Sequence, residues 1–212
     1  MKPEDLYKSL KERLKALKPT ANISDIEHYV DELYLQLKTA REDARTDHLT
    51  QLPNYKGLTE ILERETARSK RHNEPLTVGF VDFDNLKKYN DIYGHVQANH
   101  AIKSLSETIK NSLRKEDTLG RYGGDEFCII LPNTNLDNSK IIADRVLKSV
   151  NSLSIKNVVN QLPDEGYKKV TISIGFIQLK DEDYISLLNR ANKAMKAAKS
   201  NSREVSSIVY AD

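Results

Sequence analysis

The sequence predicts an α/β domain with a mixed central sheet surrounded by helices, preceded by a helical N-terminal segment. From residue 47 onward, helix-length and strand-length apolar patterns alternate, which is typical of a sheet with helices packed on it. Within residues 118–132, two short predicted strands flank a Gly-Gly turn and so form an antiparallel hairpin. A hairpin within this alternating order indicates a mixed sheet and not a purely parallel one.

The individual elements follow from apolar periodicity and from helix-breaking residues. The segment His72–Pro75, for example, ends the first predicted helix of this region. In chain order we expect a helix over 55–71, a strand over 76–84, a helix over 97–113, the hairpin within 118–132, a helix over 136–152, a strand over 170–177, a helix over 183–200 and a closing strand over 204–210.

Residues 1–46 are predicted to be helical throughout and to form a first unit, with residues 47–212 as the second. A short stripe of Leu6, Leu10, Leu14 and Leu17 ends near Pro19. Beyond it, six apolar residues recur in alternating steps of four and three, which is typical of a coiled-coil seam. A seam this narrow favours a dimerising stalk, and the alternative is a helix that lies on its own domain. The seam consists of Ile26, Val30, Leu33, Leu37, Ala40 and Ala44.

Composition limits the class of protein. Charged residues make up 30% of the 212 residues, yet the formal net charge is only +2, so a dedicated nucleic-acid binder is not expected. No apolar run reaches bilayer length and the start MKPEDLYKSL lacks a signal-peptide core, so we expect a cytoplasmic protein without membrane insertion. The single cysteine, Cys128, excludes an intrachain disulfide and lies in the apolar run FCIIL, where we expect it to be buried.

Four acidic residues stand at the ends of predicted strands. Asp82 and Asp84 close an apolar strand, and Asp125 and Glu126 follow the Gly-Gly turn. A carboxylate at the end of a buried strand is costly unless it is paired or bound to a metal ion. If the strand and the hairpin are neighbours, Asp82 and Asp125 face each other, and with a backbone carbonyl they suit Mg²⁺. The alternative is an ordinary polar hairpin tip that faces water.

Several motifs in consistent order resemble the GGDEF family, the diguanylate cyclases, which fuse two GTP molecules into cyclic di-GMP. The resemblance covers about residues 47–205 and implies a palm-like fold related to nucleotidyl cyclases and polymerases. The motifs are RYGGDEF (121–127), DHLTQLPN (47–54, with Gln51 where glycine is usual), DFDNLKKYNDIYGH (82–95, with Leu86 in place of phenylalanine), TISIGF (171–176) and ANKAMKAAKSNSR (191–203).

The resemblance implies roles for the acids and the turn. Asp82 and Asp125 match metal-binding carboxylates, with the carbonyl of Phe83 as a further ligand of Mg²⁺ or Mn²⁺, and both count as catalytic. Glu126 matches the second acid of the motif, which shares the metal and catalytic work. The turn Gly123-Gly124 lets the backbone approach the nucleotide, because no Cβ stands in the way.

Further matches imply phosphate binding and a dimer. Lys87, Lys199 and Arg203 match phosphate contacts, and amide groups at the start of the helix after Asp84 add donors. In the implied reaction, the 3′-hydroxyl of one nucleotide attacks the α-phosphate of the other and expels pyrophosphate. Each domain presents one nucleotide, so catalysis needs a homodimer, and the seam before Asp47 would raise the effective concentration of the two domains.

Base recognition departs from the family pattern. Asn90 keeps the usual asparagine, but Ala98 and Asn99 replace the glycine and aspartate of GHxxGD. A carboxylate accepts both the N1–H and N2–H₂ of guanine, whereas an amide accepts only one of them well and also complements adenine. Three outcomes stay open: GTP is still used and gives cyclic di-GMP, which we favour; ATP is also used and gives cyclic GMP-AMP or cyclic di-AMP, as in some altered members; or turnover is lost.

The segment RKED, residues 114–117, matches the family's RxxD inhibitory site, at which product binds. The resemblance implies that Arg114 and Asp117 bind the cyclic dinucleotide, and Arg145 on the following helix is a further candidate. The alternative is a charged turn between a helix and a strand. A rival function for the whole chain is a catalytically weak receptor that binds cyclic di-GMP at this site.

Overall fold

The structure is a computed structural model that describes residue 12 and residues 23–153, 170–201 and 206–211. The chain divides into two compact units, Met1–Arg45 and Thr46–Asp212. The leucine stripe over residues 6–17 and the phosphate candidate Arg203 both lie outside the described residues.

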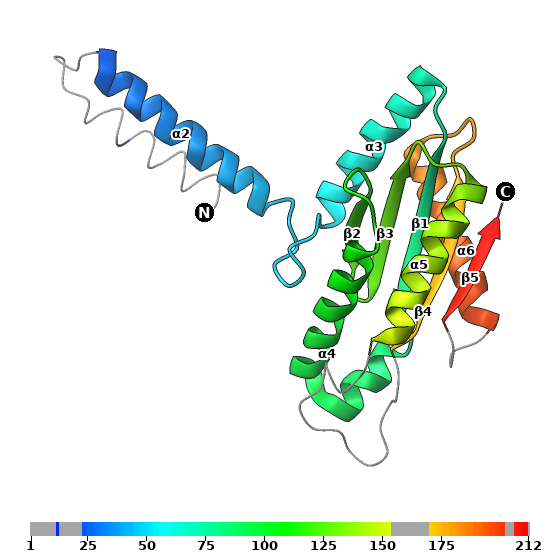
Figure 1. Cartoon of the computed structure of the whole chain (residues 1–212). Coiled ribbons are helices and arrows are strands. Elements are labelled where there is room, and N and C mark those ends of the chain that lie inside the picture. The colour runs from blue at the N-terminus through cyan, green and yellow to red at the C-terminus, as the bar shows by residue number, and fades with distance from the viewer. Residues whose placement is uncertain (1–11, 13–22, 154–169, 202–205, 212) are drawn as a thin grey trace. The chain divides into compact units, whose positions relative to one another are not determined.

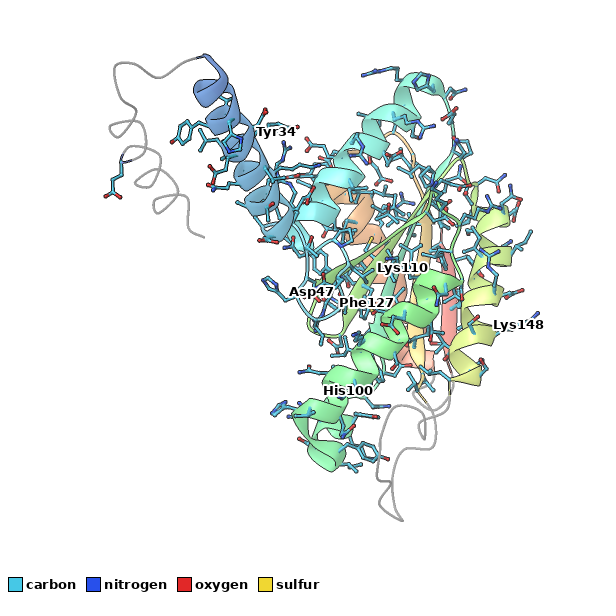
Figure 2. All side chains as sticks on the ribbon, turned by 60° about the vertical axis from the view of Figure 1, so that its left-hand side comes forward. Tyr34, Asp47, His100, Lys110, Phe127 and Lys148 are labelled. Atoms are coloured by element: carbon cyan, nitrogen blue, oxygen red, sulfur yellow. The ribbon has the colours of Figure 1, made fainter. Side chains whose placement is uncertain are left out.

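The first unit is described mainly by one helix, α2, which runs from Ile23 to Asp43 (Figure 1). Two residues of the predicted seam are largely exposed on it, Val30 and Leu37, each at 54%. Tyr34, which lies between them, is 69% exposed and projects from the helix (Figure 2). Ala44 lies beyond the helix end. The described part of this unit therefore presents an apolar face, and its role as a dimerising stalk stays a prediction.

The second unit is built on a five-stranded sheet with the strand order β2-β3-β1-β4-β5. Neighbouring strands are antiparallel except for β4 and β5, which are parallel. The predicted mixed sheet with an internal hairpin is confirmed. The strands are β1 (Leu76–Phe83), β2 (Thr118–Gly123), β3 (Glu126–Pro132), β4 (Ile172–Gln178) and β5 (Ser207–Ala211).

Four helices cover the two faces of this sheet: α3 (Tyr55–His72), α4 (Leu86–Asn111), α5 (Leu136–Ser152) and α6 (Tyr184–Asn201). Alternate residues of β1 point to opposite faces. Leu76, Val78 and Phe80 pack with the apolar residues of α3 and α6. Val81 and Phe83 pack with those of α4 and α5, which lie in front of the sheet in Figure 1.

Local signals in the sequence explain where the helices begin and end. The side chain of Asn54 accepts a hydrogen bond from Gly57 N and caps α3. At the other end, Asn73 adopts the left-handed conformation (φ 53°) and terminates the same helix. Asn135 caps α5 by accepting from Asn138 N. Asparagine suits all three positions, because its short side chain caps helices and tolerates positive φ.

The prediction for the longest helix is wrong at its start. The apolar pattern predicted a helix only from Gln97, but α4 begins at Leu86, where the family resemblance had implied a helix start, and runs to Asn111. The difference arises at Gly94, whose φ of 80° and ψ of 165° are not helical, so two helical stretches meet at a kink. Cys128 is 0% exposed, as predicted. No helix within the described residues has the length and apolarity to cross a bilayer.

Candidate active site

The acids of the two predicted motifs meet where β1 and β3 run side by side. Asp82 is paired with Glu126 in the antiparallel register. One residue further, Phe83 N donates a hydrogen bond to Asp125 O at 3.0 Å. The strand and the hairpin are thus neighbours, and the backbone of Asp125 lies beside the end of β1.

Because side chains alternate along a strand, those of Asp82 and Glu126 lie on the face of the sheet that α6 covers. Asp82 follows the inward series of Leu76, Val78 and Phe80, and Glu126 precedes the equivalent series of β3. Asp82 is only 4% exposed. Two like charges directly across a strand pair repel each other, so this pair calls for a cation.

That cation is supplied within the structure by Lys199. Its Nζ lies 2.6 Å from Asp82 Oδ1. The helix approaches closely because Gly175 on β4 has no side chain: a Cβ there would stand 2.1 Å from Met195 N. Lys199 lies one helical turn after Met195. The sequence predicted Lys199 as a phosphate contact, and the structure pairs it with Asp82.

Burial and crowding change the acidity of these groups. The pKa of Asp82 is raised to about 6 because burial disfavours its charged form, and the nearby Asp125 adds to the effect despite Lys199. The pKa of Glu126 is also raised, chiefly by burial and then by Asp125. Raised pKa values in a group of carboxylates are typical of a site that holds a cation or performs chemistry.

Asp84 is fixed just beyond the end of β1. It is 4% exposed, and its Oδ1 accepts a hydrogen bond from Ser173 Oγ at 2.7 Å. Its backbone N donates to Thr171 O at 3.0 Å. Ser173 lies opposite Asp82 on β4 and belongs to the motif TISIGF, but we did not single it out from the sequence. The signal in the sequence that could have identified Ser173 is a polar residue within an otherwise apolar strand.

A divalent metal ion fits the donors at this edge. Asp82 and Asp125 offer carboxylates, the Phe83 carbonyl follows Asp82 directly in the chain, and the contact with Lys199 shows that Asp82 attracts a cation. Within the described residues, no group of three or more His, Cys, Asp or Glu side chains is arranged to hold a metal ion. The oxygen set identified here needs only two carboxylates, since Mg²⁺ keeps other positions for water and phosphate.

The Gly-Gly turn is open to an external ligand. Gly124 has a φ of 51°, a conformation that favours glycine. A Cβ added at Gly123 or at Gly124 would meet no atom within 4 Å, so packing within the protein does not explain the missing side chains. The space above the turn therefore suits the approach of a ligand.

Arg121 donates hydrogen bonds to the backbone of this turn. Its Nη2 donates to Gly124 O at 2.7 Å and its Nε to the same oxygen at 3.1 Å. Nη1 donates to Asp47 Oδ1 at 3.1 Å. Arg121 and Asp47 each belong to a family motif, but their ion pair could not be predicted from the sequence, because the two residues are far apart in the chain.

The base-recognition candidates lie on both sides of the kink in α4. Asn90 Nδ2 and His95 Nδ1 are 2.7 Å apart, which fixes the Asn90 amide. Asn90 Oδ1 is buried and has no hydrogen-bond partner among the described residues. Ala98 is 4% exposed and packs in the core. Asn99 is exposed on the same helix.

The phosphate candidates are only partly described. Lys87 is exposed in the first turn of α4. Asn85 enters this helix with a φ of 59°, and its side chain makes no capping hydrogen bond to the first turn. The side chain of Asn85 therefore does not cap the first amide groups of α4. An anion can bind at the start of a helix only where such amide groups are not already capped.

The RxxD segment forms a tight turn beside a cavity of about 520 Å³. Asp117 Oδ2 accepts from Arg114 N at 2.8 Å, and burial raises the pKa of Asp117. Arg145 reaches the same region: its Nε donates to Ser112 O, and its charge acts on Asp117. The structure thus brings the three predicted residues of this site together, and their ligand stays a prediction.

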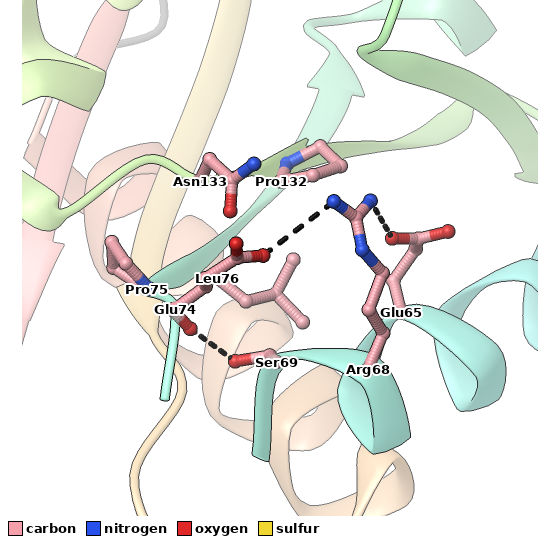
Figure 3. Close-up of a pocket in the computed structure, with 8 residues that line it drawn as sticks. All are labelled: Glu65, Arg68, Ser69, Glu74, Pro75, Leu76, Pro132 and Asn133. Carbon is pink, nitrogen blue, oxygen red and sulfur yellow. Dashed lines mark hydrogen bonds and ion pairs between the residues drawn. The ribbon is translucent and has the colours of Figure 1, made fainter. Parts of the chain in front are cut away.

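A second cavity, of about 10 Å³, lies at the opposite end of β1 and is too small for a substrate (Figure 3). Arg68 bridges Glu65 and Glu74 across it, at 3.4 and 3.5 Å. Ser69 Oγ donates to Glu74 O at 2.5 Å. The polar residues that line this cavity form ion pairs and hydrogen bonds with one another, so the cavity is part of the packing between α3 and β1.

Comparison with known proteins decides the family. The family model described as "Diguanylate cyclase, GGDEF domain" matches residues 44–205. The chain belongs to the GGDEF family. Among curated GGDEF relatives, diguanylate cyclase DgcP of Pseudomonas aeruginosa is 33% identical over 138 residues, which is 65% of this chain and 20% of DgcP. The chain thus spans about a fifth of the length of that relative.

Solved GGDEF structures share the fold. Diguanylate cyclase SiaD from Pseudomonas aeruginosa, in complex with its activator SiaC, has a TM-score of 0.72 and 32% identity, over 98% of this chain and 76% of SiaD. The coiled coil and GGDEF domain of DgcB from Caulobacter crescentus, in complex with c-di-GMP, has a TM-score of 0.77 and 25% identity, over 95% of this chain and 100% of that one. The predicted palm-like sheet with a preceding helix is confirmed.

Proposed function

We propose that the chain is a Mg²⁺-dependent cyclic dinucleotide synthase that condenses two GTP molecules to cyclic di-GMP and two pyrophosphates. One observation carries the proposal: the ends of β1 and β3 bring Asp82, Asp125 and Glu126 together beside a turn with open space above it. The names of the relatives, which include several diguanylate cyclases, support the same reaction.

In this reaction the residues at the ends of β1 and β3 would have different roles. Asp82, Asp125 and the Phe83 carbonyl would hold the metal ion, which would supply charge stabilisation for the attacking and leaving oxygens. The turn Gly123-Gly124 lies against the phosphates, since nothing fills the space beside it. Glu126, whose pKa is raised, is suited to accept the proton of the attacking 3′-hydroxyl.

Two nucleotides must meet, so the proposal includes a homodimer. The exposed Val30, Tyr34 and Leu37 on α2 support self-association through a coiled coil, and the DgcB structure also contains a coiled coil. Sedimentation of the full chain should show a dimer, and the Leu37→Glu variant should shift it toward monomer. A monomeric wild-type chain with full activity would contradict this part of the proposal.

The experiment that tests the reaction is a product assay. The full chain is incubated with GTP, with ATP and with both, in the presence of Mg²⁺, and cyclic dinucleotides are identified by mass spectrometry. We expect cyclic di-GMP from GTP and at least a hundredfold loss in the Asp125→Asn variant, because one metal carboxylate is removed. No cyclic product from any mixture would reject the proposal and favour a receptor.

A second candidate product contains adenine, and Asn99 favours it. Asn99 is exposed on α4 near the kink, and its amide complements adenine as well as guanine. Asn99→Asp is the matched variant, since it restores a carboxylate of the same size. If wild type forms cyclic GMP-AMP or cyclic di-AMP, the variant should form less of it. Absence of adenine-containing product from wild type would exclude this candidate.

A further inference from the structure

The ammonium group of Lys199 occupies a cation position at Asp82 within the protein's own fold. The two groups are 2.6 Å apart, with the side chain of Asp82 6% exposed and that of Lys199 33% exposed. Asp84 and Asp125 also act on Asp82 through their charges. A carboxylate so buried among acids needs a positive partner, and here the partner belongs to the chain itself.

We propose that Lys199 is an internal counter-ion of the metal site, which a metal ion must displace from Asp82 in order to bind there. The displaced ammonium group then becomes a cation for the phosphates of the arriving nucleotide, an inference that rests on the proposed function. Metal ion and nucleotide therefore bind with positive coupling: each one favours the position of Lys199 that the other needs.

The fold allows this exchange without a backbone movement. Gly175 lets α6 pack closely against β4 at Met195, and Ser207 Oγ donates to Ala198 O at 2.9 Å, so the helix is held in the turn that leads to Lys199. The ammonium group ends a flexible four-carbon stem. Because a third of the side chain is exposed, the stem has room to swing away from Asp82.

Lys196 provides the matched control. It lies on the same helix, is exposed, and acts with Lys199 on Glu126 through its charge. The contact at 2.6 Å to Asp82, however, is made by Lys199. Removing Lys196 takes away the same charge from the neighbourhood but leaves that contact in place. The two variants therefore separate direct competition from a general change in the electric field.

The first measurement is Mn²⁺ binding to the full chain without nucleotide, followed by electron paramagnetic resonance. Lys199→Met should bind Mn²⁺ about tenfold more tightly than wild type, within the usual range of coupling between two ligands. Lys196→Met should differ by about twofold or less, and Lys199→Arg, which keeps a cation, should stay close to wild type. Unchanged or weaker binding in Lys199→Met, or equal tightening in Lys196→Met, would overturn the proposal.

The second measurement uses 3′-deoxyguanosine triphosphate with Mn²⁺, since this nucleotide lacks the attacking hydroxyl. Lys199→Met should bind it about tenfold more weakly than wild type, opposite in sign to the metal result. Equal nucleotide affinity would overturn the coupling. If wild type does not bind the nucleotide at all, the proposed function fails, while the Mn²⁺ measurement alone still decides the competition. Protection of Cys128 from thiol reagents confirms that each variant is folded.

Discussion

Arg121 donates hydrogen bonds to both carboxylate oxygens of Asp47, at 3.1 and 3.2 Å, across a separation of 74 residues. The same guanidinium group also donates to Gly124 O in the signature turn. Only a planar fork with several donors reaches both partners at once. One arginine therefore ties the start of the second unit to the turn that precedes Asp125.

Arg121→Lys tests whether this fork positions the turn. Lysine keeps the charge but cannot serve Asp47 and Gly124 O together, so we expect a loss of about 1–3 kcal/mol in the free energy of unfolding. Nucleotide turnover should fall more than stability alone explains. Urea unfolding and turnover measured at a temperature where the variant is fully folded would show this. A variant with wild-type turnover would mean that the turn holds its shape without Arg121.

The same ion pair gives stability a defined dependence on pH. Burial tends to raise the pKa of Asp47, but hydrogen bonds from Thr50 and Arg121 outweigh it, so the folded pKa lies below the usual value of 3.8. A carboxyl group with a depressed pKa stabilises the fold above its unfolded pKa, and that contribution is lost as pH falls through the folded pKa.

Asp47→Asn should therefore be less stable than wild type at pH 7, and the difference should shrink as pH falls below about 4. Thermal unfolding of both proteins between pH 3 and 7 provides the measurement. A difference that stays constant over the whole range would show that the charge of Asp47 does not matter to the fold.

Cys128 offers a probe of folding. Burial raises the pKa of this thiol far above its ordinary value, and the side chain is fully enclosed. The thiolate is the reactive form, so the native protein should resist thiol reagents, and labelling should follow global unfolding. Mass spectrometry with and without urea tests this. Rapid labelling of the native protein would contradict the position of Cys128 in the core.

The RxxD turn can be tested without destroying it. Asp117 accepts from the backbone N of Arg114, so Arg114→Ala removes the guanidinium group and keeps this hydrogen bond. If product binds in the adjacent cavity, the variant should be inhibited at least tenfold less strongly by its own product. Lys148→Ala, at an exposed position on α5, is a charge-matched control (Figure 2). Unchanged inhibition in Arg114→Ala would reject the site.

Much of the fold was predictable because its signals are local. A continuous run of β-branched and aromatic residues located β1, and the Gly-Gly turn located the hairpin that carries Asp125. The apolar pattern did not show the first part of α4, because the kink at Gly94 divides the helix into two stretches. The pairing of Lys199 with Asp82 was not predictable, since it depends on how closely α6 approaches β4 at Gly175. The pairing register of the strands and the closeness of a helix to the sheet are set by packing between segments that are distant in the sequence.

Gly123 and Gly175 differ in their surroundings: the first faces open space and the second lies against the backbone of α6. A Cβ at Gly123 would meet nothing within 4 Å, and the residue is not among those with positive φ. Gly123→Ala should therefore change the free energy of unfolding by less than about 0.5 kcal/mol, yet reduce nucleotide binding, because the new methyl group points into space left for the ligand.

Gly175→Ala, in contrast, should lower the stability of the fold. Its Cβ would stand 2.1 Å from Met195 N, a backbone atom that cannot turn aside, so α6 must lift from the sheet. We expect a loss of about 1–3 kcal/mol or more in stability, together with a longer distance between Lys199 and Asp82. Urea unfolding and nucleotide binding of both variants form one experiment. Equal losses of stability in the two variants would mean that the open space at Gly123 is filled by the protein itself.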